Sequence, residues 1–489
     1  MPLLQSIKDQ IENIVGKGGF DATPESIQKY SNNTTEFDAP SLLGIAKPET
    51  VAAVQALVAF ANTEGIVVYP ISTGFNWGLG SKLPTAENTI LIDLGKLNKI
   101  REVHNGLRYA IIEPGVSQKQ LSDYLKANNT NLIANITGSS PGSSYIGNLL
   151  ERGTSFLRHK VDFVRAFEVV LPTGEMVRTG FWESENDQVS VLHYKHGMGP
   201  NTTDLFFQSN YGVVTAAVVS LLPRQEETLV LWAQVAAEKL EPFLEQMKLL
   251  YGHQLLSNTT HIGNDKRMKL TNAETLTWTA FCAISGPKAI NKVAVEMITQ
   301  KLSPFCKKLS FMTEDDANAS TEAYEKDMYK LHTGQPAEVF LNAMFRSHGD
   351  KDYTPSQNVD DSNIGMLCCL PIMPFSQVGV QIVLKCLKEV EAEFATEPAV
   401  TLNPINDLYL EAVINIYFDR DNKAEKERAH KANSFLHKRL YELGLRFYRL
   451  DIKEMALQPK IDSPHNRLTA TIKQSLDPKG TIAPGRYIR

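Results

Sequence analysis

Chemistry is first suggested by one glycine-rich stretch, PISTGFNWGLGSK at residues 70–82, which directly follows the run IVVY. It holds three glycines, Gly74, Gly78 and Gly80, and hydroxyl side chains flank them. A turn needs one or two glycines, whereas backbone that approaches a ligand and donates N–H groups to it needs several. The stretch therefore predicts an anion-binding loop, called the glycine loop below. A glycine-rich turn without a ligand is the alternative.

Histidines and cysteines offer a second kind of chemistry, but their spacing does not support a metal site. His193 and His196 in HYKHGMGP are three residues apart, yet no third ligand cluster accompanies them, which favours structural histidines. The five cysteines form no C-x-x-C pattern, and Cys368 and Cys369 lie in an apolar run. We therefore expect no metal, and reduced, buried and inert thiols.

Composition limits the classes of partner. The chain has 489 residues, 43% hydrophobic and 21% charged, with a net charge of −5, which is ordinary for a globular protein of more than one domain. This charge gives no reason to expect nucleic acid or an anionic membrane as a partner. The first 20 residues lack the apolar core of a signal peptide, and no apolar run approaches the ~20 residues of a membrane helix. We expect a soluble, cytoplasmic protein.

The elements around the glycine loop mix helices and strands. Residues 47–65 predict an amphipathic helix closed by Gly65, residues 66–72 and 88–94 predict strands, and residues 100–116 and 163–180 predict hairpins. The loop follows a strand without the spacing of a dinucleotide-binding βαβ unit, and no acidic residue follows at the distance a ribose needs. A nicotinamide-dependent reductase is therefore a poor interpretation.

The pattern changes near Glu226. Strand-like runs such as 228–237, 277–285, 363–373 and 410–418 then alternate with charged helical segments such as 238–250, 381–395 and 423–444. This order predicts a second α+β domain whose sheet is covered by helices on one face.

Five motifs occur in order along the chain: the glycine loop, GNLLERG, GMGPNTTDLFFQSNYGVVT, FYRLD and DPKGTIAPGR. With them the sequence resembles the FAD-linked vanillyl-alcohol oxidase and p-cresol methylhydroxylase family over nearly its whole length. The resemblance implies an α+β fold with a PCMH-type FAD-binding domain at residues 1–225 and a cap (substrate) domain with a mainly antiparallel sheet at 226–445. Residues 446–489 are then expected to return to the FAD domain and the active site.

The resemblance also implies which residues bind FAD. The glycine loop would wrap the pyrophosphate with backbone N–H groups, where Cβ atoms would collide with the phosphates, and three further segments would line the cofactor. The expected FAD-binding residues are Ser72, Thr73, Gly74, Phe75, Asn76, Trp77, Gly78, Leu79, Ser81, Pro114, Gly115, Ser140, Gly142, Gly147, Asn148, Asn210, Gly212 and Val213.

Catalytic roles follow from the same matches. Glu151 occupies the acidic position beside flavin N5 and would act as base or proton relay; a surface glutamate paired with Arg152 is the alternative. Tyr448 and Arg449 match a Tyr-Arg pair that holds a phenolate, and a permanently charged arginine also stabilises anionic reduced flavin. An exposed strand is the alternative there. Arg486 is a second candidate cation.

Three departures from the family pattern concern the substrate. Leu79 stands where phenol-binding relatives place a tyrosine, and Glu411 takes the place of a cap histidine. The segment after ERG has a different character, with Phe156, Arg158, His159 and Lys160. A para-substituted phenol is then one option, and an alcohol or amine with an acidic group is another.

The tethering position is also changed. The stretch NIGMLCCLPI at residues 363–372 has neither histidine nor tyrosine, and Tyr353 is out of register, so we expect non-covalent FAD.

The expected function is an FAD-linked oxidase or dehydrogenase. Hydride would pass from an alcohol, amine or 4-alkylphenol C–H bond to flavin N5, and O₂ or another acceptor would reoxidise the flavin. A flavin-binding protein without turnover is the alternative. The sequence determines neither the substrate nor the electron acceptor, and a homodimer is an expectation by analogy only.

Overall fold

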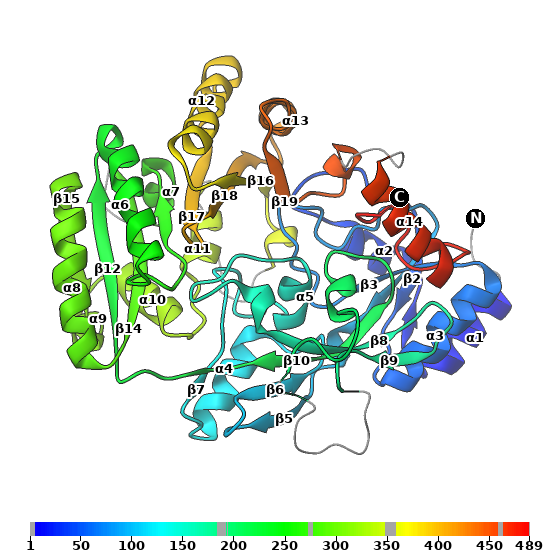
Figure 1. Ribbon diagram of the computed structural model, residues 1–489. Coiled ribbons are helices and arrows are strands. Elements are labelled where there is room, and N and C mark those ends of the chain that lie inside the picture. Colours follow the sequence, from blue (N-terminus) through cyan, green and yellow to red (C-terminus); the bar gives the residue numbers. More distant parts are fainter. Residues whose placement is uncertain are drawn as a thin grey trace.

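The computed structural model describes residues 5–182, 192, 194–271, 277–347, 358–457 and 463–488 (Figure 1). Its first sheet has four strands in the order β1-β2-β4-β3, with β2, β4 and β3 mutually parallel. The strands are β1 (Phe20–Asp21), β2 (Leu42–Ala46), β3 (Val67–Ile71) and β4 (Thr89–Asp93), and the helices are α1 (Gln5–Val15), α2 (Pro24–Ser31) and α3 (Val51–Glu64). The expected helix around residues 47–65 is α3, which Thr50 caps and Gly65 ends at φ +67°.

A second, antiparallel sheet has the strand order β5-β6-β10-β8-β9. It comprises β5 (Ile100–His104), β6 (Tyr109–Ile112), β8 (Val164–Val170), β9 (Met176–Arg178) and β10 (Val213–Ser220). Both predicted hairpins are confirmed as β5–β6 and β8–β9. A small pair, β7 (Leu132–Ile133) and β11 (Leu222–Pro223), and helices α4 (Gln118–Ala127) and α5 (Tyr145–Leu150) complete this part.

The third sheet, called the cap sheet below, has eight antiparallel strands in the order β15-β12-β14-β13-β17-β18-β16-β19. They are β12 (Glu227–Val235), β13 (His261–Gly263), β14 (Trp278–Gly286), β15 (Cys306–Met312), β16 (Ile364–Pro374), β17 (Ala399–Pro404), β18 (Tyr409–Asp419) and β19 (Arg446–Arg449). The predicted α+β fold class is confirmed, both by these sheets and by the comparisons below.

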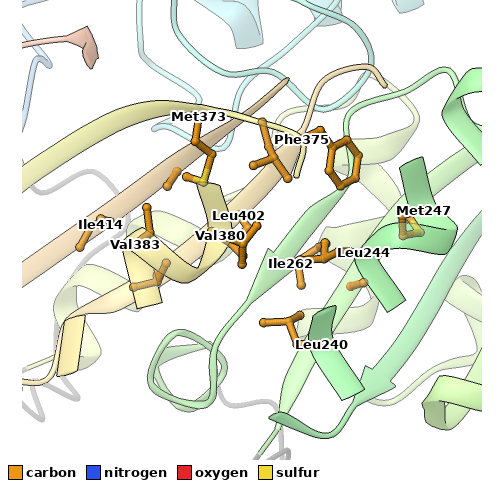
Figure 2. Packing of buried hydrophobic residues seen from close by; sticks show 14 of the residues in the cluster. Leu240, Leu244, Met247, Ile262, Met373, Phe375, Val380, Val383, Leu402 and Ile414 are labelled. Atoms are coloured by element: carbon orange, nitrogen blue, oxygen red, sulfur yellow. The ribbon is translucent and has the colours of Figure 1, made fainter. Parts of the chain in front are cut away.

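One face of the cap sheet is covered by helices, as expected. These are α6 (Leu240–Gly252), α8 (Lys288–Leu302), α12 (Gln377–Phe394) and α13 (Lys423–Glu442). Near this face Leu240, Leu244 and Met247 of α6 and Val380 and Val383 of α12 pack with residues of the strands (Figure 2). Burying each such side chain contributes about 1.5–3 kcal/mol relative to leaving it exposed.

Because side chains alternate along the strands, the cap sheet also has a face that points away from the helices. Leu402 and Ile414 point to the helix-covered core, so their neighbours one residue away face the opposite side. In the cross-strand register Asn403 lies opposite Glu411, and Cys368 lies opposite Asn415. The short helices α7 (Asp265–Leu270), α9 (Glu314–Ala319), α10 (Ala323–His332) and α11 (Val339–Arg346) complete this part.

The C-terminal segment, residues 446–489, contacts both the cap sheet and the first sheet. Strand β19 pairs with β16 and therefore stays with the cap sheet. After helix α14 (Pro464–Leu476), Ile482 forms a parallel bridge to Val68, beside the first sheet. The exact domain boundaries remain predictions. Across the described ranges, no helix has both the length and the apolar character needed to cross a bilayer.

Candidate active site

A cavity of about 400 Å³ lies between the glycine loop, α5 and the strands β16, β17 and β18. All four expected catalytic residues, Glu151, Tyr448, Arg449 and Arg486, line it, although they come from three distant parts of the chain. The fold therefore brings this predicted set together in one place. Whether each residue has its expected role remains a prediction.

The glycine loop supplies the cavity with unused backbone donors. Gly74 adopts φ +73°, and the N–H groups of Gly74, Phe75 and Asn76 have no acceptor within the described part of the chain. All three residues line the cavity. Consecutive free N–H groups favour an anion, so this end of the cavity fits a diphosphate.

At two of the three glycine positions in the loop, glycine is required for a different reason from the expected contact with phosphates. A Cβ on Gly78 would lie 2.3 Å from Cys368 Sγ, and the Gly78 carbonyl accepts a hydrogen bond from the Cys368 N–H at 3.0 Å. A Cβ on Gly80 would meet Ile452 at 3.0 Å. These glycines therefore let the loop pack against other parts of the protein, and neither lines the cavity.

Most of the expected FAD-binding residues do line the cavity. They are Ser72, Thr73, Gly74, Phe75, Asn76, Trp77, Leu79, Ser81, Pro114, Gly147, Asn148 and Gly212. Gly147 shows why glycine is needed in α5: a Cβ there would lie 2.4 Å from Ser72 Oγ, so only glycine lets the helix approach the glycine loop.

Six expected FAD-binding residues do not line it: Gly78, Gly115, Ser140, Gly142, Asn210 and Val213. Gly115 donates its N–H to the Leu97 carbonyl at 2.6 Å, and Asn210 Nδ2 donates to the Ala483 carbonyl at 3.0 Å. Val213 is fully buried in the core of the first sheet. Adjacent residues of the same motifs form the cavity surface instead.

Buried polar atoms along the same wall also fit FAD. Asn148 Oδ1, Ser143 Oγ and Trp77 Nε1 are buried and have no hydrogen-bond partner within the described ranges. A buried polar atom without a partner is costly in free energy, and a polar cofactor would supply the missing partners. The residues present therefore fit FAD.

Glu151 is held as a carboxylate by two cations. It ends α5, and its Oε1 accepts from Arg486 Nη2 at 2.7 Å while its Oε2 accepts from Tyr487 Oη at 2.8 Å. Arg449 Nε lies 3.9 Å from Oε2. Burial by itself would raise the pKa of Glu151, but the charges of Arg486 and Arg449 outweigh it and hold the pKa below its usual value. The alternative pairing with exposed Arg152 is not found.

Arg449 also joins the cap sheet to the glycine loop. Its Nη2 donates to Asn76 Oδ1 at 2.6 Å. Gln208 Nε2 donates to the Tyr448 carbonyl at 2.6 Å, which fixes the backbone of β19 beside the cavity-lining segment that contains Gln208. The alternative of an exposed strand at this position is therefore wrong: Tyr448 is buried and Arg449 is part-buried.

A second carboxyl group, that of Glu411, has a raised pKa, in contrast to that of Glu151. Thr154 Oγ1 donates to Glu411 Oε2 at 2.7 Å and lies 3.1 Å from Tyr448 Oη, so Tyr448, Thr154 and Glu411 form a hydrogen-bonded chain. His159 Nε2 lies 3.7 Å from Glu411 Oε1. Burial raises the pKa of Glu411 to about 7, and burial also raises that of Tyr448.

The segment after ERG changes the pocket less than expected. Phe156 lines the cavity and stacks on His261 with ring centroids 4.0 Å apart. Arg158 is exposed, and Lys160 is fully buried away from the cavity wall with its Nζ 4.1 Å from the centroid of the Tyr145 ring. Neither residue brings charge to the lining. Leu79 does line the cavity, as expected.

Several lining residues were missed because no motif contains them. They form the cap end of the cavity: His261, Arg267, Phe340, Met344, Thr401, Asn403, Asn415 and Tyr417. Alternation along β17 and β18 could have indicated Thr401, Asn403, Asn415 and Tyr417 as one face. Nothing in the sequence singles out Arg267.

The cysteine and histidine predictions have mixed outcomes. Cys368 and Cys369 are buried free thiols, as predicted, and burial raises the pKa of Cys368 to about 12, but Cys368 also lines the cavity. His196 is exposed, whereas His193 and Tyr353 lie outside the described residues. Within the described ranges, no three histidine, cysteine or carboxylate side chains cluster as metal ligands would.

Comparison with known sequences gives an independent result. Residues 42–180 match the family described as FAD binding domain. The chain is 28% identical to 1'-carboxy-chondrochloren decarboxylase of Chondromyces crocatus, over 95% of this chain and 94% of that protein. It is 25% identical to the 4-cresol dehydrogenase [hydroxylating] flavoprotein subunit of Pseudomonas putida, over 89% and 86%.

Solved structures agree on the fold. Substrate-bound p-cresol methylhydroxylase superposes with a TM-score of 0.89 at 20% identity, covering 100% of this chain and 98% of the other. The isoeugenol complex of 4-ethylphenol oxidase from Gulosibacter chungangensis gives a TM-score of 0.88 at 21% identity, covering 99% and 96%. At this level of identity the likeness shows a shared fold.

Proposed function

Because this chain is an FAD-linked enzyme whose resemblance to the vanillyl-alcohol oxidase and p-cresol methylhydroxylase family is confirmed, we propose that it oxidises a small molecule. The bond broken is a substrate C–H next to oxygen, nitrogen or an aromatic ring. Bound FAD supplies the two-electron acceptor, which O₂ or another acceptor reoxidises. The observation that carries the proposal is the hydrogen-bonded chain from Tyr448 through Thr154 to Glu411: Tyr448 and Thr154 line the cavity, and the buried carboxyl of Glu411 lies behind its wall. The pKa values of Glu411 and of the lining residue Glu151 are displaced in opposite directions.

Glu411 is the better proton acceptor of the two. A catalytic base works best when its pKa lies near the operating pH, and the pKa of Glu411 is about 7. A substrate hydroxyl or amine bound against Tyr448 can lose its proton through Tyr448 and Thr154 to Glu411, since these groups are already hydrogen-bonded in series.

Glu151 has a different role in this proposal from the one expected from its motif. It is already ionised and shared between Arg486 and Tyr487, which makes it a weak base. It instead orients Arg486 and Arg449. These two cations outnumber the single carboxylate, so their excess positive charge stabilises negative charge that develops during the reaction.

A second candidate reaction follows from the relative that is named a decarboxylase. If hydride leaves a carbon next to an ionised phenol ring, the product is an electron-poor quinone methide. A carboxylate one carbon farther along can then leave as CO₂, and the electron pair of the broken C–C bond forms a new C=C bond and restores the ring. The two electrons removed with the hydride reside on the acceptor.

Anaerobic titration of the FAD-loaded protein tests the oxidation. Alcohols, amines and 4-alkylphenols, each with and without a carboxylate, are added while the visible flavin absorbance is followed. Bleaching supports the proposal, and CO₂ released in equal amount to reduced flavin identifies the decarboxylating variant. No bleaching by any compound would favour a flavin-binding protein without turnover.

A variant pair tests the assigned base. Glu411→Gln is expected to slow flavin reduction by about 10²–10⁴-fold, the usual contribution of a positioned base. The matched control is Glu393→Gln, an exposed position on α12, and it leaves the rate unchanged. Equal rates in both variants would remove Glu411 from the mechanism.

A further inference from the structure

We propose that the cap end of the cavity binds a carboxylate of the substrate and that Arg267 is its anchor. This inference rests on the proposed function and names the substrate class: a compact acid with an aromatic or otherwise apolar body. It starts from the charges on the cavity wall. The charged lining residues are Glu151, Arg267, Arg449 and Arg486.

Arg267 is the one of these three arginines that does not approach an acidic side chain among the described residues. Arg486 and Arg449 both approach Glu151, at 2.7 Å and 3.9 Å. Arg267 forms no ion pair with an acidic side chain anywhere in the described ranges. His261 cannot balance or add charge, because burial lowers its pKa to about 3 and keeps the ring neutral. The cap end therefore carries one positive charge without a counter-ion.

The structure holds Arg267 in place rather than leaving it in solvent. Its backbone N–H donates to Asn264 Oδ1 at 2.8 Å, which caps α7. Its guanidinium lies over the Phe340 ring, 4.6 Å from the centroid, and Nη1 donates to Tyr417 Oη at 3.3 Å. Its Nε is buried and has no acceptor within the described part of the chain. A fixed guanidinium with an unused donor is a preformed anion site.

Neighbouring unpaired groups point to the same ligand. Asn403 is only 1% exposed, and both polar atoms of its amide lack partners among the described residues. His261 Nε2 is also buried without a hydrogen-bond partner within the described ranges, and the Asn403 side chain lies close enough to raise the pKa of the His261 ring, although burial lowers it overall. Both side chains line the cavity. Leaving so many buried donors and acceptors unpaired costs free energy that a polar ligand group would recover.

The chemistry of this end favours a carboxylate over a phosphate. A carboxylate is planar, carries one charge and matches a single guanidinium, whereas a phosphate carries nearly two charges and three acceptor oxygens. Only one cation is available here. Phe156, Phe340 and Met344 form the adjoining apolar wall, which suits the body of an aromatic acid.

Residues of the cap sheet connect Arg267 with the part of the cavity near Arg449, so one substrate can contact both arginines. Arg267, Tyr417, Asn415 and Cys368 form a continuous series of contacts across the cap sheet. Arg449 and Arg267 both act to lower the pKa of the Cys368 thiol, although burial raises it overall. A substrate can thus place its carboxylate at Arg267 and its oxidisable end toward Arg449.

Ligand binding to the FAD-loaded protein tests this without requiring turnover. The probes are 3-(4-hydroxyphenyl)propanoate, 4-hydroxycinnamate and indole-3-propanoate, each compared with its methyl ester, and the readout is the perturbation of the oxidised flavin spectrum. At least one acid is expected to bind 10-fold or more tightly than its ester. Arg267→Gln should weaken that acid about 10–100-fold, as expected for a charge-assisted contact, and leave the ester within about 3-fold.

Two controls separate this role from folding and cofactor binding. Lys266→Gln changes the adjacent residue, whose Nζ pairs with Glu397 at 2.5 Å away from the cavity, and should leave both affinities unchanged. Arg267→Lys keeps the charge but loses the planar fork, so it should bind the acid with intermediate affinity. FAD content and melting temperature confirm that each variant is folded.

The outcomes distinguish this inference from the proposed function. If no acid binds more tightly than its ester, or if Arg267→Gln weakens acid and ester alike or releases FAD, the carboxylate site is wrong. Acid-selective binding without flavin reduction by any substrate would overturn the oxidation and leave the site standing. Flavin reduction without tighter binding of acids than of esters would support the oxidation and overturn the carboxylate site.

Discussion

Replacing Glu411 with glutamine should change how the stability of the protein depends on pH. Glu411 is almost completely buried, and its pKa rises from an ordinary 4.5 to about 7 because burial penalises the ionised form. Glutamine has nearly the same shape and stays neutral at every pH. The variant therefore isolates the free energy of ionising this one carboxyl.

The sign and size follow from proton linkage. Below pH 4.5 both folded and unfolded states hold the proton, and the carboxyl adds no pH dependence. Between pH 4.5 and 7 the unfolded state loses its proton first, so the stability of the wild type falls as pH rises. The displacement is about 2.5 pKa units, which at 1.36 kcal/mol per unit amounts to about 3 kcal/mol by pH 8. Glu411→Gln abolishes this loss.

Urea unfolding of the FAD-loaded protein at pH 5 and pH 8 measures the effect. The free energy of unfolding of Glu411→Gln, relative to that of the wild type, should rise by about 2–3 kcal/mol from pH 5 to pH 8. Any effect of the amide that does not depend on pH cancels in this comparison. The exposed control Glu393→Gln should show no such gain. A difference between wild type and Glu411→Gln that is the same at both pH values would refute the assignment of a near-neutral pKa to Glu411.

Three further predictions concern the relay, the loop and the cofactor. Thr154→Val removes a hydrogen bond that lowers the pKa of Glu411, so the pH midpoint of flavin reduction, measured by rapid mixing, should move upward; an unchanged midpoint contradicts the relay. Gly78→Ala places a Cβ 2.3 Å from Cys368 Sγ at φ +75° and should destabilise the protein by about 2 kcal/mol or more in urea unfolding. Adding Cys368→Ala should recover part of that loss, and no recovery would disprove the contact. Acid precipitation should release FAD into the supernatant, whereas flavin that stays with the pellet would show a covalent link.

Much of the local structure could be predicted because its causes are local. Helix α3 has its cap at Thr50 and its end at Gly65 within one short segment, and both hairpins of the second sheet turn within a few residues. Spacing and turn chemistry act over such distances, so a sequence displays them directly. The glycine loop was also visible, but the reason for Gly78 was not, because Cys368 lies far along the chain.

The same distinction between local and long-range causes applies to the active site. The ordered motifs and the family resemblance predicted an FAD site with Glu151, Tyr448, Arg449 and Arg486, and all four residues line the cavity. Only the tertiary structure decided their electrostatics. Thr154 reaches Glu411 across 257 positions, and Arg486 reaches Glu151 across 335, so the sequence shows neither contact.

The roles of the two carboxylates therefore belong to the fold. Glu151 and Glu411 are the same residue type with the same ordinary pKa, and their local sequences do not determine the direction in which each pKa is displaced. The charges of Arg486 and Arg449 outweigh burial and hold the pKa of Glu151 below its usual value, whereas burial outweighs the Thr154 hydrogen bond and the Arg449 charge and raises the pKa of Glu411 to about 7. A pKa depends on desolvation and on charges brought close in space, and only the folded chain determines either.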